Sequence, residues 1–198
     1  MWIFILIVII LIISYIYITY NSLNFLDKKS NREFLNLDNF FKKRINLIPT
    51  LVNIFSRYNL EKDTLQRMTF LIKDDYNMLS SKERIEMNVE LNNLIDRLWE
   101  VADANIILKQ NPVFLNAIKQ FNLVEEEIIT SKKYYNEATL KYNKKVRRFP
   151  SNIIALILKF KLKPIYDVIE ENRKVIKTDL EIKNPIKFED KKEEDVII

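Results

Sequence analysis

The first residues form an unbroken uncharged run, and the rest of the chain alternates apolar and charged positions with helical spacing. Residues 2–20 hold no charged side chain, and at about 1.5 Å per residue a helix of that length matches the hydrocarbon thickness of a bilayer. We therefore predict a transmembrane anchor over residues 1–22. A cleaved signal peptide would need a basic start and small residues at its cleavage point, where tyrosines stand instead. They are Tyr15, Tyr17 and Tyr20.

The charges beside the anchor predict its orientation. Lys28, Lys29 and Arg32 follow the run within a few residues, whereas only the α-amino group precedes it. The positive-inside rule counts Lys and Arg rather than net charge. We expect a single-pass protein of the cell membrane with its N-terminus outside and its domain in the cytoplasm.

Over residues 27–170 apolar side chains recur about every seven positions, which is the pattern of helices that pack on one another. The expected fold is all-α, with an elongated antiparallel four-helix bundle after the anchor. The first helix is predicted to run from about Asp27 to Leu79, with a kink or break at Pro49. The other three are expected to begin at an S-x-x-E capping box, at an Asn-Pro N-cap and after a Phe-Pro break. These starts are Ser80, Asn111 and Ser151.

Two segments leave alternatives open. Arg44 falls in an apolar column, so it either pairs with a buried carboxylate or extends its charged end into solvent, and we favour the second. Residues 153–158 are apolar all round and continue into a basic stretch expected to end at Pro164. They either pack into the bundle, which we favour, or touch lipid. The charged segment 171–198 is predicted to be disordered.

Composition excludes most enzyme classes. The chain has no Gly, no His and no Cys, which excludes phosphate-binding glycine loops, Cys or His nucleophiles, thiolate or imidazole zinc sites and disulfides. We expect no catalytic residue, no cofactor, no metal and no small-molecule substrate. The net charge of +5 is spread among acids, so nucleic-acid binding is not expected. A carboxylate-based enzyme remains the least favoured alternative, using Glu125 with Glu126, Glu127 or Asp103.

Several short motifs occur together in one order. The anchor is followed by Y-N-S-L, which holds Tyr20 and Asn21, and residues 42–52 read K-K-R-I-N-L-I-P-T-L-V. Farther on, Y-N-E-A, Y-N and F-P-S-N-I-I-A follow one another. Together they resemble the motifs of the LemA family. The residues on which this resemblance rests are Tyr20, Asn21, Arg44, Pro49, Tyr135, Asn136, Tyr142, Asn143, Phe149 and Pro150.

Membership of that family implies a membrane-anchored helical bundle with a poorly defined molecular role and no active site. The chain departs from the family pattern at Asn46, where an aspartate is usual. If the family pairs that acid with the adjacent arginine, Arg44 needs another partner here. The candidates are Glu100, Asp103 and Glu125.

These observations favour a non-enzymatic interaction or scaffold protein that binds an unknown protein partner or itself. Asn21, Asn136 and Asn143 are candidate contact residues, although interhelical hydrogen bonding is the favoured interpretation for them. The alternative is binding to an anionic membrane surface through the cations around residues 144–163. These are Lys144, Lys145, Arg147, Arg148, Lys159, Lys161 and Lys163.

Overall fold

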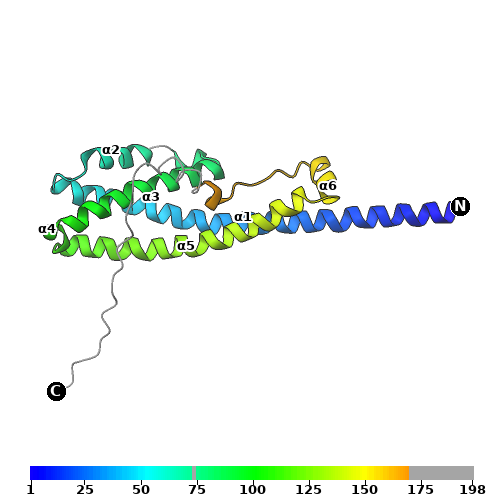
Figure 1. The fold of residues 1–198 in the computed structure, drawn as a ribbon, viewed down its shortest axis with the longest axis horizontal. Coiled ribbons are helices and arrows are strands. Elements are labelled where there is room, and N and C mark those ends of the chain that lie inside the picture. Colours follow the sequence, from blue (N-terminus) through cyan, green and yellow to red (C-terminus); the bar gives the residue numbers. More distant parts are fainter. Residues whose placement is uncertain (73–74, 170–198) are drawn as a thin grey trace, which may run out of the picture.

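The computed structural model describes residues 1–72 and 75–169, and throughout this part of the chain the regular elements are helices. The predicted all-α class is therefore confirmed, whereas the predicted disordered tail lies outside the described residues. In chain order (Figure 1), the elements are α1 (Trp2–Arg57), α2 (Lys62–Leu71), the 3-10 turn η1 (Tyr76–Met78), α3 (Ser81–Ala104), α4 (Ile106–Lys109), α5 (Pro112–Arg147) and α6 (Ser151–Ile157).

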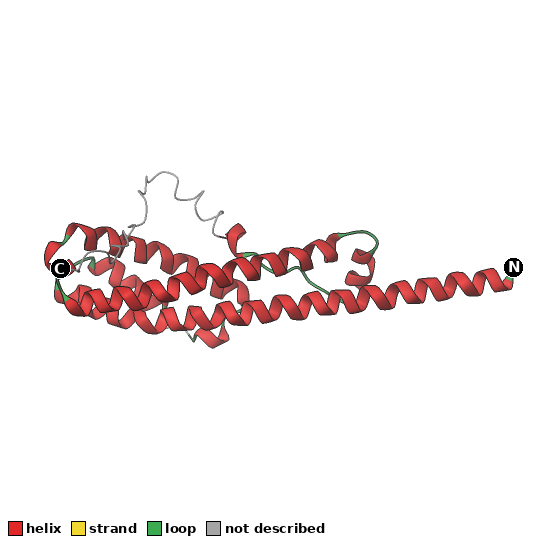
Figure 2. Cartoon of the chain, turned by 90° about the horizontal axis from the view of Figure 1, so that it is seen from below, coloured by secondary structure: helices red, strands yellow, loops and turns green. Residues whose placement is uncertain are grey.

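The apolar run and the first bundle helix are one continuous helix of 56 residues, α1. At 1.5 Å per residue α1 is about 84 Å long. Its first part projects beyond the other helices, and the apolar side chains there are exposed, as at Trp2 (88%) (Figure 2). Within the described residues, α1 is the one helix long and apolar enough to cross a membrane by length and composition.

Helix α5 lies along α1 and runs the opposite way. Ser30 and Thr139 share a buried hydrogen bond of 2.8 Å, whereas Phe55 packs edge-on against Phe114 with ring centroids 5.8 Å apart. The paired residue numbers rise in α1 and fall in α5. We call the end near Arg57, α4 and the start of α5 the distal end. The end near α6, which faces the apolar run, is the proximal end (Figure 1).

The first bundle helix ends at Arg57, not near Leu79 as predicted. Its end has the hydrogen bonds of a Schellman motif: the Asn59 amide donates to Ser56 O (3.1 Å) and the Leu60 amide donates to Phe55 O (3.2 Å). Asn59 has φ 53°, a left-handed conformation that Asn tolerates better than most residues. The chain has no Gly, so its sequence lacks the glycine that usually indicates a helix end of this kind.

Pro49 does not break α1, so that alternative of the prediction is wrong. The proline ring is exposed, and its neighbours Ile48 and Leu51 are buried in the core. Burial of these side chains offsets the loss of one backbone hydrogen bond.

The predicted starts of the next two long helices are confirmed. Ser80 Oγ accepts from the Glu83 amide (3.3 Å), and Glu83 Oε2 accepts from the Ser80 amide (2.7 Å), which completes the capping box. Hydrogen bonds from Ser80 also lower the pKa of the Glu83 carboxyl. Asn111 Oδ1 accepts from the amides of Val113 (2.8 Å) and Phe114 (3.3 Å) at the start of α5.

The last predicted helix is shorter than expected. Helix α6 ends at Ile157, and Lys159 adopts a left-handed φ of 59° while the Phe160 amide donates to Ala155 O (2.9 Å). Residues 160–165 are then non-helical, and helical conformation resumes at Tyr166. The basic continuation to Pro164 is therefore not a helix. We call residues 160–165 the return segment.

Candidate functional site

Arg44 is a fully buried arginine at the centre of the bundle, with none of its surface exposed. Its Nη1 donates to Glu125 Oε1 (3.1 Å) and to the side-chain oxygen of Asn92. Its Nη2 donates to Asn88 O (2.9 Å) and to Asn88 Oδ1 (2.6 Å). Residues of α1, α3 and α5 thus meet at one guanidinium group.

The favoured interpretation of Arg44 as a solvent-reaching side chain is wrong. A buried guanidinium is tolerated when its charge is matched and most of its donors are paired. The surrounding amides and one carboxylate pair both Nη groups, whereas the buried Nε has no hydrogen-bond partner. Of the three candidate carboxylates, Glu125 is confirmed as the partner. Asp103 instead pairs with Lys109, and Glu100 is exposed.

A second buried charge lies six residues before Arg44 in α1. Asp38 is 1% exposed; its Oδ1 accepts from the Tyr76 hydroxyl (2.6 Å), and its Oδ2 accepts from Arg84 Nη1 (2.9 Å) and lies 3.1 Å from Lys42 Nζ. Burial, reinforced by the hydrogen bond to Asp38, raises the pKa of Tyr76 well above its usual range. Sequence analysis did not single out Asp38. The sequence feature that could have indicated a role for Asp38 is Lys42, which lies four residues later on the same helix face.

The two buried charges belong to one hydrogen-bond network. Asn88 accepts from Arg44 and donates through Nδ2 to Arg84 O (2.8 Å), and Arg84 binds Asp38. The network therefore joins α1, α3 and α5. Because the side chains of this network hydrogen-bond to one another, the network holds the three helices in position.

Two Tyr-Asn pairs of α5 hold the return segment. The first pair, Tyr142 and Asn143, lies near the end of α5 that leads to α6. The Tyr142 hydroxyl donates to Lys161 O (2.8 Å). Asn143 holds both backbone groups of Lys163: Nδ2 donates to its carbonyl (2.8 Å) and Oδ1 accepts from its amide (2.9 Å). The Asn143 side chain therefore pairs with the backbone of Lys163 in the way that the backbone of an adjacent β-strand would.

The second pair repeats the contact one heptad earlier. The Tyr135 hydroxyl donates to Pro164 O (2.6 Å), and Asn136 Oδ1 accepts from the Tyr166 amide (2.9 Å). A spacing of seven places both pairs on one face of α5. We call these four residues, Tyr135, Asn136, Tyr142 and Asn143, the Tyr-Asn clamp.

Lys163 ties the return segment to α1 as well. Its Nζ lies 2.8 Å from Asp27 Oδ1 and donates to Asp27 O (2.9 Å) and Asn31 Oδ1 (2.7 Å). The segment is thus held from two helices although it has no helical hydrogen bonds of its own.

The clamp tyrosines are shielded from ionisation. Burial raises the pKa of Tyr135 to about 12. Burial, with the negative charge of Asp27, raises the pKa of Tyr142 to about 12. Both hydroxyls therefore remain protonated donors near neutral pH.

Asn136 and Asn143 are 5% and 6% exposed, so neither offers a surface to a partner. Asn143 binds Lys163 of the return segment, and Asn136 accepts from the amide of Tyr166, which directly follows that segment. The remaining family-motif residues are exposed: Tyr20, Asn21, Pro49, Phe149 and Pro150. Tyr20 lies beside Phe160, with ring centroids 6.4 Å apart. The Phe149-Pro150 peptide is cis at the turn between α5 and α6.

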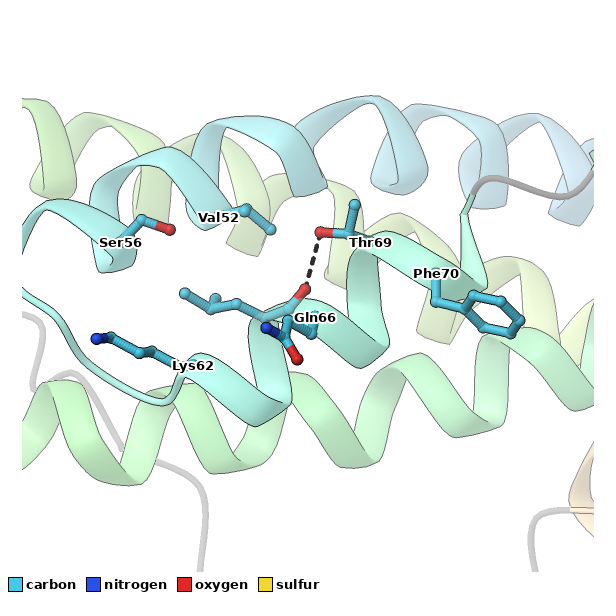
Figure 3. Close-up of a pocket in the computed structure, with 7 residues that line it drawn as sticks. Val52, Ser56, Lys62, Gln66, Thr69 and Phe70 are labelled. Atoms are coloured by element: carbon cyan, nitrogen blue, oxygen red, sulfur yellow. Dashed lines mark hydrogen bonds between the residues drawn. The ribbon is translucent and has the colours of Figure 1, made fainter.

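A first hollow, of about 550 Å³, opens between α1 and α2. Figure 3 shows Val52 and Ser56 of α1 facing Lys62, Gln66 and Thr69 of α2 across it. The dashed hydrogen bond, from Thr69 Oγ1 to Leu65 O (2.8 Å), stays within α2. Its lining combines apolar side chains with polar uncharged ones and one cation, Lys62.

A second hollow, of about 460 Å³, lies between α3 and α5 at the distal end. It is mainly apolar, with acidic and amide groups at its edge. We call it the distal groove. Its lining residues are Trp99, Ala102, Asp103, Lys109, Phe114, Leu115, Ile118, Asn122, Glu125, Glu126 and Ile129.

Within residues 1–72 and 75–169, no group of three or more acidic side chains lies close enough together to hold a metal ion. The polar centres found there, around Arg44, Asp38 and the clamp, have their hydrogen bonds directed at neighbouring helices and backbone. This geometry is suited to holding helices and the return segment in position.

The geometry defines a class: a long helical protein whose first helix carries an exposed apolar run and whose return segment is held against the bundle by paired Tyr and Asn side chains. The model of the LemA family matches residues 33–180, which is most of the chain. The chain therefore belongs to the LemA family, and the resemblance noted in its sequence is confirmed. No curated protein matches the chain.

Proposed function

We propose that this chain is a membrane-anchored, non-enzymatic interaction or scaffold protein of the LemA family. Residues 1–22 anchor it, and an elongated antiparallel four-helix bundle stands on the cytoplasmic side. The apolar run supports the anchor because its side chains are left exposed by the rest of the chain, which is costly in water and favourable in lipid.

The observation that carries the interaction role is the distribution of apolar surface at the distal end. Four apolar side chains there are at least half exposed: Ile106 (72%), Ile107 (71%), Val113 (60%) and Leu115 (51%). Leu115 also lines the distal groove. Clustered exposed apolar side chains beside a groove are typical of a protein-binding surface.

Two of the three carboxylates that line the distal groove are engaged in ion pairs, which supports a binding role over a catalytic one. Glu125 is held by Arg44, and Asp103 by Lys109. A carboxylate whose oxygen is already engaged by a cation of the same chain is less available to a substrate. We therefore propose a partner protein or a second copy of the chain as the ligand.

Photo-cross-linking in living cells tests this proposal. A benzoylphenylalanine at Leu115 is expected to give a discrete product, at twice the mass of the chain for self-association or at the summed mass of chain and partner. The matched control is Lys133, an exposed residue of α5 away from the groove. A second change on the same surface, Ile107→Asp, is expected to abolish the product. Equal products from Leu115 and Lys133, or a Leu115 product unaffected by Ile107→Asp, would contradict the proposal.

A further inference from the structure

The outer face of α6 is apolar and exposed. Ile154 and Ala155 on its inner face are buried against Leu23 of α1. On the outer side, large apolar side chains face away from the bundle, and the turn before α6 adds another. They are Phe149 (73% exposed), Ile153 (50%), Leu156 (80%) and Ile157 (70%).

This face lies at the level where the apolar run of α1 ends. Leu23 packs under α6, and Tyr20 contacts Phe160, which follows α6 directly. Three residues of α-helix span only about 5 Å, so α6 lies beside the last turn of the run. Figure 1 shows α6 at the end of the bundle nearest the N-terminus. If residues 2–20 cross a bilayer, α6 stands at the headgroup region.

The chain segment that contains α6 carries charge of one sign. Residues 138–166 contain eight Lys and Arg side chains and no Asp or Glu. Lys163 is engaged with Asp27, but most of the others are exposed. The eight are Lys141, Lys144, Lys145, Arg147, Arg148, Lys159, Lys161 and Lys163.

We propose that α6 and the turn before it form a second membrane contact, which we call the membrane foot (Phe149, Ile153, Leu156 and Ile157). Its side chains insert into the interface of the same bilayer that holds the anchor, and the neighbouring cations bind anionic phospholipid headgroups. Apolar side chains within a predominantly basic surface are the combination that interfacial helices use. The inference rests on the proposed anchoring, because the anchor brings α6 to this depth.

A bilayer fits this face better than a protein partner for two reasons. The cations lie on both sides of α6, in the last turn of α5 and after α6, which suits an extended anionic plane. The face also coincides in depth with the end of the apolar run. Two contacts with one membrane fix the rotation of the bundle about α1, so the foot sets the direction in which the distal groove faces.

The full-length chain allows a clean test because it has no Cys. Single cysteines at Leu156, Ile107 and Ser14 are labelled with an environment-sensitive fluorophore. Each protein is reconstituted into vesicles of phosphatidylcholine, with or without phosphatidylglycerol, that carry lipids with a shallow or a deep quencher. Ile107 is the matched control, since it is an exposed apolar residue at the distal end, and Ser14 reports on the anchor alone.

The proposal predicts strong quenching at Leu156 by the shallow lipid, at least about twofold above that at Ile107, and further quenching when phosphatidylglycerol is present. The reversal of three exposed cations, Lys144→Glu, Arg147→Glu and Arg148→Glu, is expected to remove the effect of phosphatidylglycerol.

Each contrary result would have a different meaning. Deep quenching at Ser14 with Leu156 no more quenched than Ile107 would overturn the foot and leave the anchor standing. No quenching at Ser14 would overturn the anchor and the foot together. A Leu156 probe shielded from water but not quenched by lipid would assign this face to protein contact. Equal quenching with and without phosphatidylglycerol would overturn the role of anionic headgroups.

Discussion

The distal and proximal parts of the bundle are stabilised by different interactions. The distal core consists of aromatic and aliphatic side chains, with Trp99 edge-on to Phe121 (5.5 Å between centroids) and Phe55 edge-on to Phe114 (5.8 Å). Toward the proximal end, the buried side chains include charged and polar ones: Arg44, Asp38, Ser30, Thr139 and the Tyr-Asn clamp.

The difference follows from what each part must hold in place. Helices that already satisfy their own backbone hydrogen bonds can be held by apolar burial, which has no preferred direction. Residues 161–164 of the return segment lie outside the helices, so their amide and carbonyl groups need partners at fixed positions. The proximal part therefore depends on directional contacts, and substitutions should separate the two modes.

The largest effect is expected for Arg44→Leu. Loss of the guanidinium leaves Asn88, Asn92 and Glu125 without their shared donor, so the free energy of unfolding should fall by about 3–5 kcal/mol. Urea unfolding of the detergent-solubilised chain, followed by circular dichroism, measures it. The exposed control Lys119→Leu should stay within about 0.5 kcal/mol of the parent. Equal midpoints for the two variants would show that the buried network contributes nothing.

Ionisation of the clamp is expected next in size. The folded pKa of Tyr135 is raised to about 12 from an ordinary value near 10, so the neutral form is favoured by folding. Its stabilisation is complete below pH 10 and is lost as the pH rises through about 12, which amounts to about 2–3 kcal/mol.

Tyr135→Phe should flatten the decline of stability between pH 10 and 12, whereas the exposed neighbour change Tyr134→Phe should not. Urea midpoints measured across this pH range decide the matter. An identical pH dependence in both variants would disprove the assignment of Tyr135.

Asn143→Leu tests the clamp at neutral pH. It leaves the amide and carbonyl of Lys163 unpaired, so we expect a loss of about 1–3 kcal/mol and faster hydrogen exchange at the Lys163 amide. Asn116→Leu, at an exposed site on the same helix, is the control. Unchanged exchange at Lys163 would mean that the segment is held by other contacts.

The smallest effect is expected for Phe114→Leu in the distal core. An apolar residue of similar size keeps most of the burial, so the loss should be under about 1.5 kcal/mol. The measurement is the same urea unfolding. A loss as large as that of Arg44→Leu would remove the distinction between the two parts of the bundle.

The helical class and the family could be predicted from the sequence because both depend on local signals. The capping box at Ser80 and the Asn111-Pro112 start are short motifs with one structural meaning, and the structure has both. The helix ends at Arg57 and Ile157 could not be predicted in the same way. Their left-handed positions are filled by Asn59 and Lys159 in a chain without Gly, so the usual stop signal is missing.

The buried polar site was predicted only in part. Glu125 could be proposed for Arg44 because a buried cation requires an acid, whereas Asn88 and Asn92 could not, since an amide on a helix also fits a solvated face. The role of the clamp was missed for a different reason. Its partners are backbone atoms of a segment expected to be helical, and side-chain patterns do not reveal such contacts.

Topology is the most direct test of the account, because both the interaction role and the membrane foot depend on it. Single cysteines at Trp2 and Leu115 are treated in intact cells with a maleimide that does not cross membranes. We expect Trp2→Cys to be labelled from outside and Leu115→Cys to react only after permeabilisation. Labelling of Leu115→Cys in intact cells, with Trp2→Cys protected, would place the bundle on the opposite side and contradict the account.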